Sequence, residues 1–335
     1  MRRHPPAALS LVVAGLLSLA GLPAMAQGRA GAADAAAGFP TKPVRMVVPL
    51  APGGGSDIVG RIVALSLAER WGQSVVVDNR PGAGGNIGNA IVAKSPPDGY
   101  TLLVSSSTMA ISPSLYRDQP ADIVRDFQPV TLLASQPSIV VAHPSVPAKT
   151  LKELIAVMRA QPGKLTFGSA GAGTASHLAN EQFLIAAGVK ALHVPYKSAG
   201  LATGALLGGE IQFMVTNMAT ALPQVKAGRL KAFAVTGARR EPSVADLPTA
   251  AEAGLAGYEY TTWYGMLLPA GVPGPLLAKV HTDVTAALRE PQARERFAAQ
   301  GLEVHGSSVA EFARYLRAEV AKWSGVVQVA GLTPQ

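Results

Sequence analysis

The pattern of apolar positions in the first part of the chain alternates between two kinds of segment. Residues 44–49, 75–78 and 101–104 are short runs rich in β-branched and apolar residues, which is typical of buried strands. Over 58–70 the apolar residues recur every three or four positions, and a second helix is predicted over 87–94, after a glycine-rich turn. Strands that alternate with helices in this way predict a parallel sheet with helices on its faces.

The pattern starts again after a proline-punctuated stretch, 113–129. Further strands are predicted over 130–133, 139–142, 165–168, 191–196, 211–215, 230–235 and 261–268, and further helices over 151–161, 177–187, 200–208, 222–227, 275–288, 291–300 and 309–329. The last helix has one apolar face, formed by Phe312, Leu316, Val320, Trp323 and Val327. Two α/β units in one chain predict a two-lobed protein whose ligand lies beyond the carboxyl ends of the strands.

The first residues have the pattern of a secretory leader. Two arginines precede an apolar run over 7–22, and a small-x-small cleavage site ends at Ala26. The apolar run is shorter than the about 20 residues of a membrane span, although a retained anchor is the alternative. We therefore expect 1–26 to be a signal peptide, 27–38 to be a flexible tether, and the mature chain to be periplasmic.

Composition narrows the possible functions. With 48% hydrophobic and 15% charged residues, the chain can bury a large core, which excludes disorder as its main state. The absence of cysteine excludes disulfides, thiolate metal sites, cysteine nucleophiles and an acylated-cysteine anchor. The net charge of +8 is compatible with an anionic ligand. Because the lysines and arginines are dispersed along the chain, the alternative is that this charge serves only solubility. We expect no nucleic-acid partner, since a basic face interleaved with aromatic residues is missing.

Two glycine-rich turns lie between a predicted strand and a predicted helix. They are Pro-Gly-Gly-Gly-Ser-Asp at 52–57 and Ser-Ala-Gly-Ala-Gly-Thr at 169–174. Glycine lets a ligand approach the backbone, and the helix that follows offers unpaired N–H groups to an anion. One such turn from each lobe would clamp a negatively charged group; the alternative is a pair of tight structural turns. The hydroxyl cluster at 105–108 is a third candidate, with helix capping as its alternative.

Metal and catalytic signals are weak. His177 and Glu181 have the spacing of two ligands on one helix, but no third ligand is near, and such a pair is usually a surface interaction. His193, inside an apolar strand, is expected to be a core histidine. The chain lacks a Gly-x-Ser-x-Gly elbow and a defensible Ser/His/Asp set, so we expect no metal, no cofactor and no enzyme; an exported α/β enzyme is the alternative.

Ordered short motifs share the pattern of one family along nearly all of the mature chain. They include Asn-Arg-Pro-Gly-Ala-Gly-Gly-Asn at 79–86 and His-Val-Pro-Tyr-Lys at 193–197. The full set of segments is 39–45, 52–57, 79–88, 97–102, 171–178, 193–197, 226–230, 247–249, 252–254 and 263–265. In these segments the chain resembles the Bug-type solute-binding proteins, the extracytoplasmic receptors of tripartite tricarboxylate transporters.

The resemblance implies a type II periplasmic-binding-protein fold. It implies one lobe over 39–140 plus 260–335 and a second over 141–259, joined by crossover strands. It also implies a small carboxylate held in the cleft between the lobes by the two glycine loops, partly through bridging waters. Carried over to this chain, the ligand-binding residues are Gly53, Gly54, Gly55, Ser56, Asp57, Ser107, Thr108, Ser169, Gly171, Gly173 and Thr174.

Two positions depart from the pattern of many relatives. After Tyr196-Lys197 the chain reads Ser198-Ala199-Gly200-Leu201-Ala202 where many relatives read Gly-x-x-Pro-Ala, and it has Thr216 where they carry Asp. We hypothesise that the far end of the ligand is handled differently here, with Thr216 at the site. Trp263 is a further candidate, either as an apolar anchor lining the cleft or as part of the core.

The function expected from this resemblance is non-enzymatic capture of a small acid. Dicarboxylates, tricarboxylates, amino acids and aromatic acids all stay open as ligands. We expect a monomer that delivers its ligand to membrane transporter subunits; a receptor that feeds a sensor domain in a signalling system is the alternative.

Overall fold

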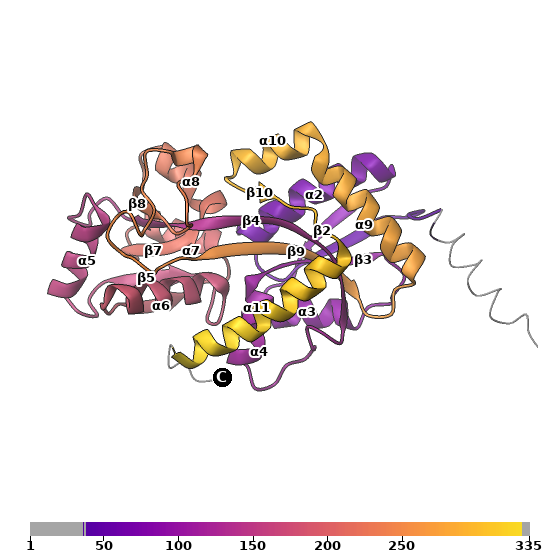
Figure 1. The fold of residues 1–335 in the computed structure, drawn as a ribbon, viewed down its shortest axis with the longest axis horizontal. Coiled ribbons are helices and arrows are strands. Elements are labelled where there is room, and N and C mark those ends of the chain that lie inside the picture. Colours follow the sequence, from indigo (N-terminus) through magenta and orange to yellow (C-terminus); the bar gives the residue numbers. More distant parts are fainter. Residues whose placement is uncertain (1–35, 37, 330–335) are drawn as a thin grey trace, which may run out of the picture.

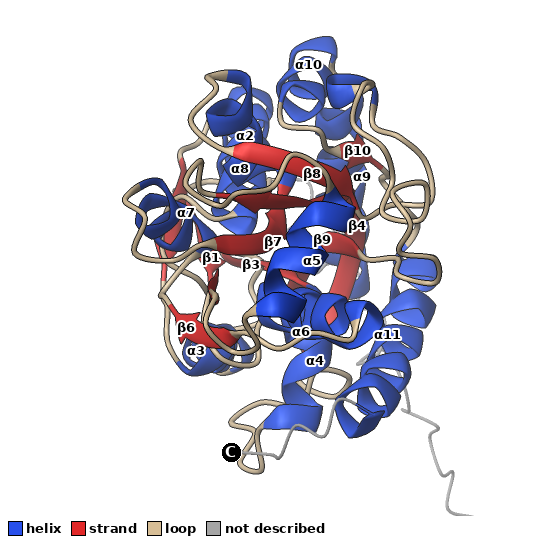
Figure 2. Cartoon of the chain, turned by 90° about the vertical axis from the view of Figure 1, so that its left-hand side faces the viewer, coloured by secondary structure: helices blue, strands red, loops and turns tan. Residues whose placement is uncertain are grey.

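The computed structural model describes residues 36 and 38–329, so the predicted signal peptide and nearly all of the predicted tether lie outside the described residues. Two groups of strands and helices lie at opposite ends of the long axis, and two long strands run between them (Figure 1). Figure 2 shows helices on both sides of the strands. This is the two-lobed α/β architecture that the sequence predicts.

The first lobe is built on a parallel sheet. Its strands are β1 (Val44–Val48), β2 (Val75–Asn79) and β3 (Thr101–Ser106). Its other elements are α2 (Gly55–Trp71), η1 (Ala83–Gly85), α3 (Asn86–Ala93), α4 (Ser107–Leu115), α9 (Gly274–Arg289), α10 (Pro291–Ala299) and α11 (Val309–Val329). Strand β1 lies in the middle, with Met46 paired to Val77 of β2 and to Leu102 of β3.

The second lobe repeats the arrangement. Its strands are β5 (Thr166–Ser169), β6 (Leu192–Pro195), β7 (Phe213–Asn217) and β8 (Lys231–Val235). Its helices are α5 (Leu151–Ala160), α6 (Ala175–Ala187), α7 (Ala199–Leu207), α8 (Met218–Lys226) and η2 (Pro242–Val244). Strand β5 pairs in parallel with β6 and β7, so β5 and β7 send their carboxyl ends to the same edge of the sheet.

The long strands β4 (Phe127–Ala142) and β9 (Thr261–Pro269) connect the lobes and pair antiparallel with each other. The second half of β4 then pairs with β7 and β8, and the short β10 (Glu303–Val304) pairs with its middle. The sequence predicted two strands in place of β4, because polar residues near Pro137 interrupt the apolar run without interrupting the backbone pairing. Since both half-sheets share β4, the division at residues 140 and 260 stays a prediction.

Helix α4 was not predicted, because Pro113 and the prolines that follow it indicated a loop. The proline lies in the last turn of this short helix, where it removes few backbone hydrogen bonds. The hydroxyl cluster at 105–108 therefore spans the junction between β3 and α4, at the carboxyl end of a strand of the parallel sheet.

Aromatic and aliphatic side chains fill the core of each lobe. Met46, Leu67 and Leu102 are fully buried in the first lobe, and Phe167 and Phe213 in the second. Burying such a side chain stabilises the fold by about 1.5–3 kcal/mol.

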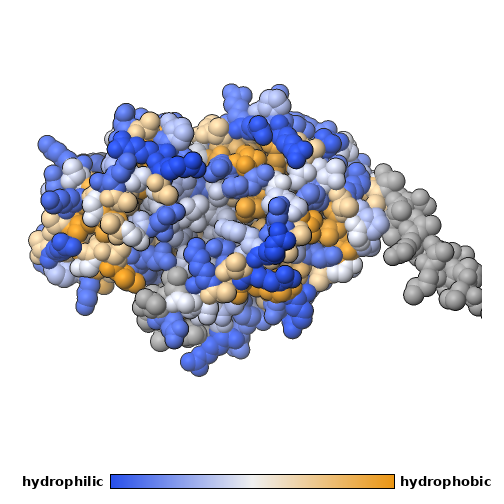
Figure 3. Space-filling model, in the orientation of Figure 1, coloured by the Kyte–Doolittle hydropathy of each residue, from blue (hydrophilic) through white to orange (hydrophobic). Residues whose placement is uncertain are grey.

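Helix α11 buries the face that its spacing predicts, with Phe312, Leu316 and Trp323 all at most 2% exposed. None of the described helices is long and apolar enough to cross a bilayer. On the face shown in Figure 3, hydrophilic residues interrupt the apolar patches.

Candidate functional site

The first glycine loop is held in place by a buried carboxylate. Asp57 is 4% exposed and accepts hydrogen bonds from the Gly53 N–H at 3.0 Å and from Asn79 Nδ2 at 3.0 Å. Arg61 Nε lies 3.0 Å from the same carboxylate and balances its charge. Asp57 thus shapes the loop, while the N-terminus of α2 presents the backbone of Gly55 and Ser56, whose N–H groups have no partner inside the helix.

The second glycine loop is held by hydroxyl groups at the start of α6. Thr174 is the N-cap residue, and its Oγ1 donates to the Gly171 carbonyl at 2.8 Å. Ser176 Oγ accepts a hydrogen bond from the Ala170 N–H at 2.8 Å. These bonds fix the conformation of the loop against the N-terminus of α6.

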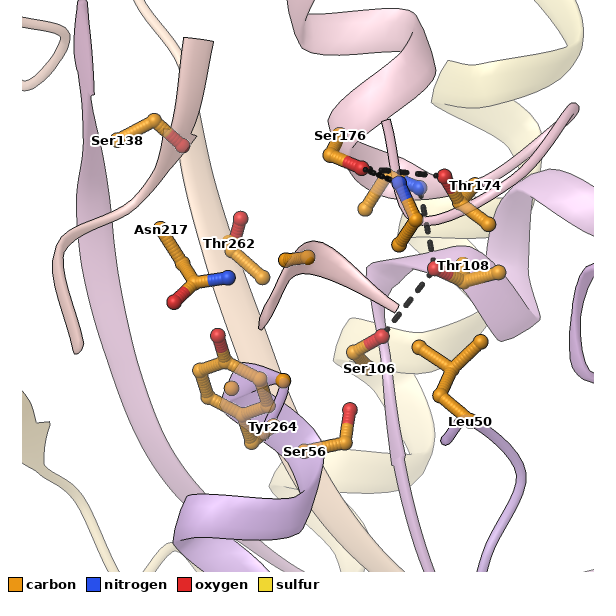
Figure 4. A pocket seen from close by; sticks show the side chains of 15 residues that line it. Leu50, Ser56, Ser106, Thr108, Ser138, Thr174, Ser176, Asn217, Thr262 and Tyr264 are labelled. Carbon is orange, nitrogen blue, oxygen red and sulfur yellow. Dashed lines mark hydrogen bonds between the residues drawn. The ribbon is translucent and has the colours of Figure 1, made fainter. Parts of the chain in front are cut away.

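The two loops meet at a small cavity between the lobes, which we call the inner chamber. It encloses about 30 Å³. Its walls are Leu50, Gly54, Gly55, Ser56, Ser106, Thr108, Ser138, Ala170, Thr174, Ala175, Ser176, Ala199, Asn217, Thr262 and Tyr264. The polar side chains from both lobes and from the crossover strands converge on it (Figure 4). Hydroxyl, amide and backbone groups line the chamber, and none of its lining residues is acidic or basic.

Several hydrogen-bond donors in the inner chamber make no hydrogen bond to the residues that the structure describes. Ser56 Oγ, Ser138 Oγ and Asn217 Nδ2 make no hydrogen bond within the described part of the chain and are not shielded from the chamber. Other groups are engaged: Tyr264 Oη accepts from Gln136 Nε2 at 2.8 Å. The free donors are therefore the groups that could meet an anion.

Of the predicted ligand-binding residues, Gly54, Gly55, Ser56, Thr108 and Thr174 line the inner chamber. Gly171 lines a neighbouring cavity described below. The remaining predicted residues of the two loops line neither cavity; they are Gly53, Asp57, Ser169 and Gly173.

Three of the residues predicted to bind ligand, Ser107, Thr216 and Trp263, are buried and line neither cavity. Ser107 is fully buried, and its Oγ accepts a hydrogen bond from the Trp263 N–H at 3.1 Å. Trp263 is 0% exposed, donates from Nε1 to Glu319 Oε2 at 2.9 Å and packs on Phe312, so the core alternative holds. Thr216 is 0% exposed, and its hydroxyl has no partner among the described groups.

The residues next to these three line the chamber instead. Side chains alternate between the two faces of a strand, so Asn217 takes the place expected for Thr216, and Tyr264 with Thr262 takes the place expected for Trp263. Ser138, on β4, is another lining residue that the sequence did not indicate. The sequence does show that side chains alternate between the two faces of each strand. This alternation does not say which of the two faces meets the other lobe.

A pair of stacked histidines supports the second loop from below. The rings of His177 and His193 are 3.9 Å apart, and Ser169 Oγ and His193 Nε2 share a hydrogen bond of 2.6 Å. Burial, with a smaller contribution from the charge of His177, lowers the pKa of His193 to about 3. His177 is buried, and its Nε2 lies 3.4 Å from Glu181 Oε1. No group of three or more residues of the kinds that bind metal occurs in the described ranges.

A larger cavity, the outer chamber, adjoins the inner one. It encloses about 360 Å³ and shares Leu50 and Ala170 with the inner chamber. The rest of its wall consists of Pro81, Gly82, Ala83, Gly84, Gly85, Tyr116, Gly171, Ala172, Tyr196 and Lys197. Both lobes therefore contribute to it.

Hydrogen bonds across the cleft hold the lobes together. The Ala175 N–H donates to Thr108 Oγ1 at 3.0 Å, and Ser198 Oγ donates to the Pro52 carbonyl at 3.2 Å. Tyr116 Oη donates to the Ala172 carbonyl at 3.1 Å. With so small an inner chamber, these contacts describe a closed arrangement of the lobes.

Comparison with known proteins identifies relatives over almost the whole described chain. The profile of the family described as tripartite tricarboxylate transporter family receptor matches residues 59–332. The structure of the periplasmic binding protein BugD is 35% identical, with a TM-score of 0.86 over 89% of this chain and 100% of that one.

Two further solved relatives carry ligands. The R. palustris protein Rpa4515, solved with adipate, is 34% identical, with a TM-score of 0.86 over 89% of this chain and 100% of its own. MatC from Rhodopseudomonas palustris, solved with bound malate, is 31% identical, with a TM-score of 0.82 over 86% of this chain and 100% of its own.

Proposed function

Because the chain belongs to the tripartite tricarboxylate transporter receptor family, a family of periplasmic solute-binding receptors, we propose that its inner chamber binds a carboxylate group of a small organic acid. The main support for this proposal is the set of unpaired hydrogen-bond donors on Ser56, Ser138 and Asn217. They converge from both lobes on a chamber that no acidic side chain lines. An oxygen anion is the group that such a set of donors satisfies. The relatives solved with adipate and malate support an organic acid as the ligand class.

A cation is not required in such a site. Hydrogen bonds to a charged acceptor contribute about 1.5–3 kcal/mol each, and waters can bridge the remaining distance. The N-terminus of α2 adds backbone N–H groups and the positive end of the helix dipole. The anion is therefore held by dipoles that the fold orients before the ligand arrives.

The receptor acts by capture and delivery, without chemistry on the ligand. The leader at 1–26 takes the chain to the periplasm, where the monomer closes around the acid. The membrane subunits of the transporter then meet a shape that forms only when the lobes are closed. A sensor domain would read the same closed shape, and uptake of labelled ligand by cells with and without the receptor separates the two roles.

A thermal-shift panel on the refolded mature chain tests carboxylate binding. The panel contains dicarboxylates, tricarboxylates, amino acids and aromatic acids, each with its amide. A ligand at 100 times its Kd stabilises the protein by about 2.7 kcal/mol, which raises the Tm by roughly 2–4 °C per kcal/mol. A shift with an acid that its amide does not give supports the proposal; equal shifts with both, or a flat panel, would overturn it.

A variant pair locates the site. Ser56→Ala removes a free donor from the inner chamber, whereas Ser66→Ala alters another buried serine of α2, whose Oγ donates to the Ile62 carbonyl at 3.3 Å. We expect the first variant to weaken binding of the identified acid by about tenfold, and the second to leave it unchanged. Equal affinities in both variants would place the acid elsewhere.

A further inference from the structure

A buried glutamine on β4 links the inner chamber to helix α8, and its role rests on the proposed function. Gln136 is 1% exposed and lines neither chamber. Its Oε1 accepts a hydrogen bond from the Ala219 N–H at 3.2 Å, and its Nε2 donates to Tyr264 Oη at 2.8 Å. The amide therefore connects the first turn of α8, in the second lobe, with the hydroxyl of a β9 residue that lines the chamber.

The direction of these two hydrogen bonds is fixed by their backbone end. A backbone N–H can only donate, so the oxygen of the Gln136 amide faces Ala219 and its NH2 group faces Tyr264. An amide NH2 group donates and does not accept, so the oxygen of Tyr264 is the acceptor. The hydrogen of the Tyr264 hydroxyl has to point elsewhere, and it makes no hydrogen bond with another of the described residues.

The Tyr264 hydroxyl lies where a bound carboxylate needs a donor. It borders the inner chamber at the N-terminus of α2, where a β-carbon on Gly55 would collide with Tyr264 Oη. Burial raises the pKa of this hydroxyl, so the group keeps its proton at neutral pH. The hydrogen that Gln136 leaves free is thus placed beside the backbone N–H groups of Gly55 and Ser56, which have no partner inside the helix.

Helix α8 orients a second amide of the chamber in the same way. Asn217 is the N-cap residue of α8, and its Oδ1 accepts a hydrogen bond from the Thr220 N–H at 2.9 Å. This bond occupies the oxygen of the amide and leaves the Nδ2 group of a chamber-lining side chain unpaired among the described residues (Figure 4). In both amides the first turn of α8 occupies the oxygen, so hydrogen atoms, not lone pairs, are left for the chamber.

We propose that Gln136 is a positioning residue that makes the Tyr264 hydroxyl a donor to the bound carboxylate. A relay runs from the Ala219 N–H through the Gln136 amide and the Tyr264 hydroxyl to the ligand, and each bond in it points its hydrogen toward the anion. Consecutive hydrogen bonds of one direction polarise each other and strengthen the last one. The chamber therefore prefers a carboxylate over the amide of the same acid, whose NH2 group would meet a donor.

Tyr264→Phe tests whether the hydroxyl donates to the carboxylate. Isothermal titration compares malate, adipate, citrate, glutamate and benzoate, each with its amide, and the acid that binds the wild type most tightly is the probe. Loss of a donor to a charged oxygen should weaken the probe by about tenfold and its amide by less than about threefold. Unchanged affinity for the probe, or an equal loss for the probe and its amide, would overturn the proposal.

A double-mutant cycle tests the role of Gln136. Gln136→Glu keeps an oxygen for the Ala219 N–H but presents the other oxygen to Tyr264, so the hydroxyl turns its hydrogen away from the chamber. The added charge repels an anion in any background, whereas the reversal requires the hydroxyl. We expect Gln136→Glu to weaken the probe about tenfold more in the wild type than in Tyr264→Phe. An equal loss in both backgrounds would leave Gln136 only a structural role and overturn the proposal.

Gln128→Glu is the matched control. Gln128 lies on the same strand, exchanges hydrogen bonds with the backbone of Val272 and lines neither chamber, so its variant should bind the probe like the wild type. If Gln136→Glu does not fold, Gln136→Met replaces it in the cycle. That variant only removes the donor that orients the hydroxyl, so the expected ratio between backgrounds is about two- to threefold, and equal losses again overturn the proposal.

The two proposals fail in different ways. If none of the five acids binds the folded wild type, the proposed function is overturned, and the relay with it. If an acid binds but the cycle shows equal losses, carboxylate binding stands and only the role of Gln136 is lost.

Discussion

Gly200 at the start of α7 packs directly on the backbone of Gly53 in the opposite lobe. A β-carbon at residue 200 would lie 2.6 Å from the Gly53 carbonyl oxygen and 2.9 Å from its carbonyl carbon. Contacts this short with backbone atoms cannot be relieved by a side-chain rotation. The closed arrangement of the lobes therefore depends on the absence of a side chain at this position.

Gly200→Ala is accordingly expected to oppose closure. We predict at least a tenfold loss of affinity for the identified acid, with a small change in the Tm of the ligand-free protein. Gly204→Ala is the matched control, because it lies on the same helix and a β-carbon there would meet nothing within 4 Å. This control should keep its affinity and gain about 0.5–1 kcal/mol of stability, as is usual for glycine replaced in a helix. Wild-type affinity in Gly200→Ala would show that closure is not needed for binding.

Thr108→Val removes the acceptor that the Ala175 N–H uses across the cleft. In the closed form this N–H is then buried without a partner, at a cost of about 1–3 kcal/mol, whereas separated lobes let water reach it. We predict about a tenfold weaker ligand affinity by titration. Thr282→Val, at an exposed helix position, should bind like the wild type. A loss of stability in the ligand-free protein with unchanged affinity would contradict this role of Thr108.

The neighbours Trp263 and Tyr264 should respond differently to substitution. Trp263→Phe removes the bond to Glu319 and leaves space in the core, so we expect about 1–3 kcal/mol less stability and unchanged affinity. Tyr264→Phe removes a hydroxyl from the wall of the inner chamber, so we expect weaker binding. Urea unfolding and titration on both variants give the comparison, and weaker binding in Trp263→Phe alone would reverse the assignment of the two faces of β9.

Acid should destabilise the protein through His193. Its pKa is about 3 in the folded chain and 6.5 without the fold, so between these values the unfolded chain binds a proton that the folded chain does not. Stability therefore falls as the pH falls from about 6.5 to 3, by at most about 1.4 kcal/mol per pH unit and by less because the ring is partly exposed.

The measurement is urea unfolding over this pH range. His193→Gln should flatten the slope, whereas His143→Gln, outside the stacked pair, should retain it. The same slope in both variants would assign the acid sensitivity to other groups.

Much of the secondary structure followed from the sequence because its signals are local. The period of apolar residues in α11 and the glycine turns before α2 and α6 depend on neighbours within a few positions. The missed elements depend on distant partners: β4 stays continuous through Pro137 because β9 pairs with it up to that residue and β7 pairs with it from Ser138 onward. Likewise, α4 forms although its own sequence indicates a loop, and it packs against α11, far along the chain.

Local sequence signals were enough to predict most strands and helices, the two-lobed architecture and the family, and they placed Gly54, Gly55, Ser56, Thr108 and Thr174 among the residues that line the inner chamber. Their role in binding a ligand stays a prediction. Which face of β4, β7 and β9 meets the opposite lobe could be read only from the folded chain. The tertiary structure thereby put Ser138, Asn217 and Tyr264 at the chamber in place of Thr216 and Trp263. The physical reason is that alternation along a strand defines two faces, but only packing between segments more than a hundred residues apart selects the one that lines the cleft.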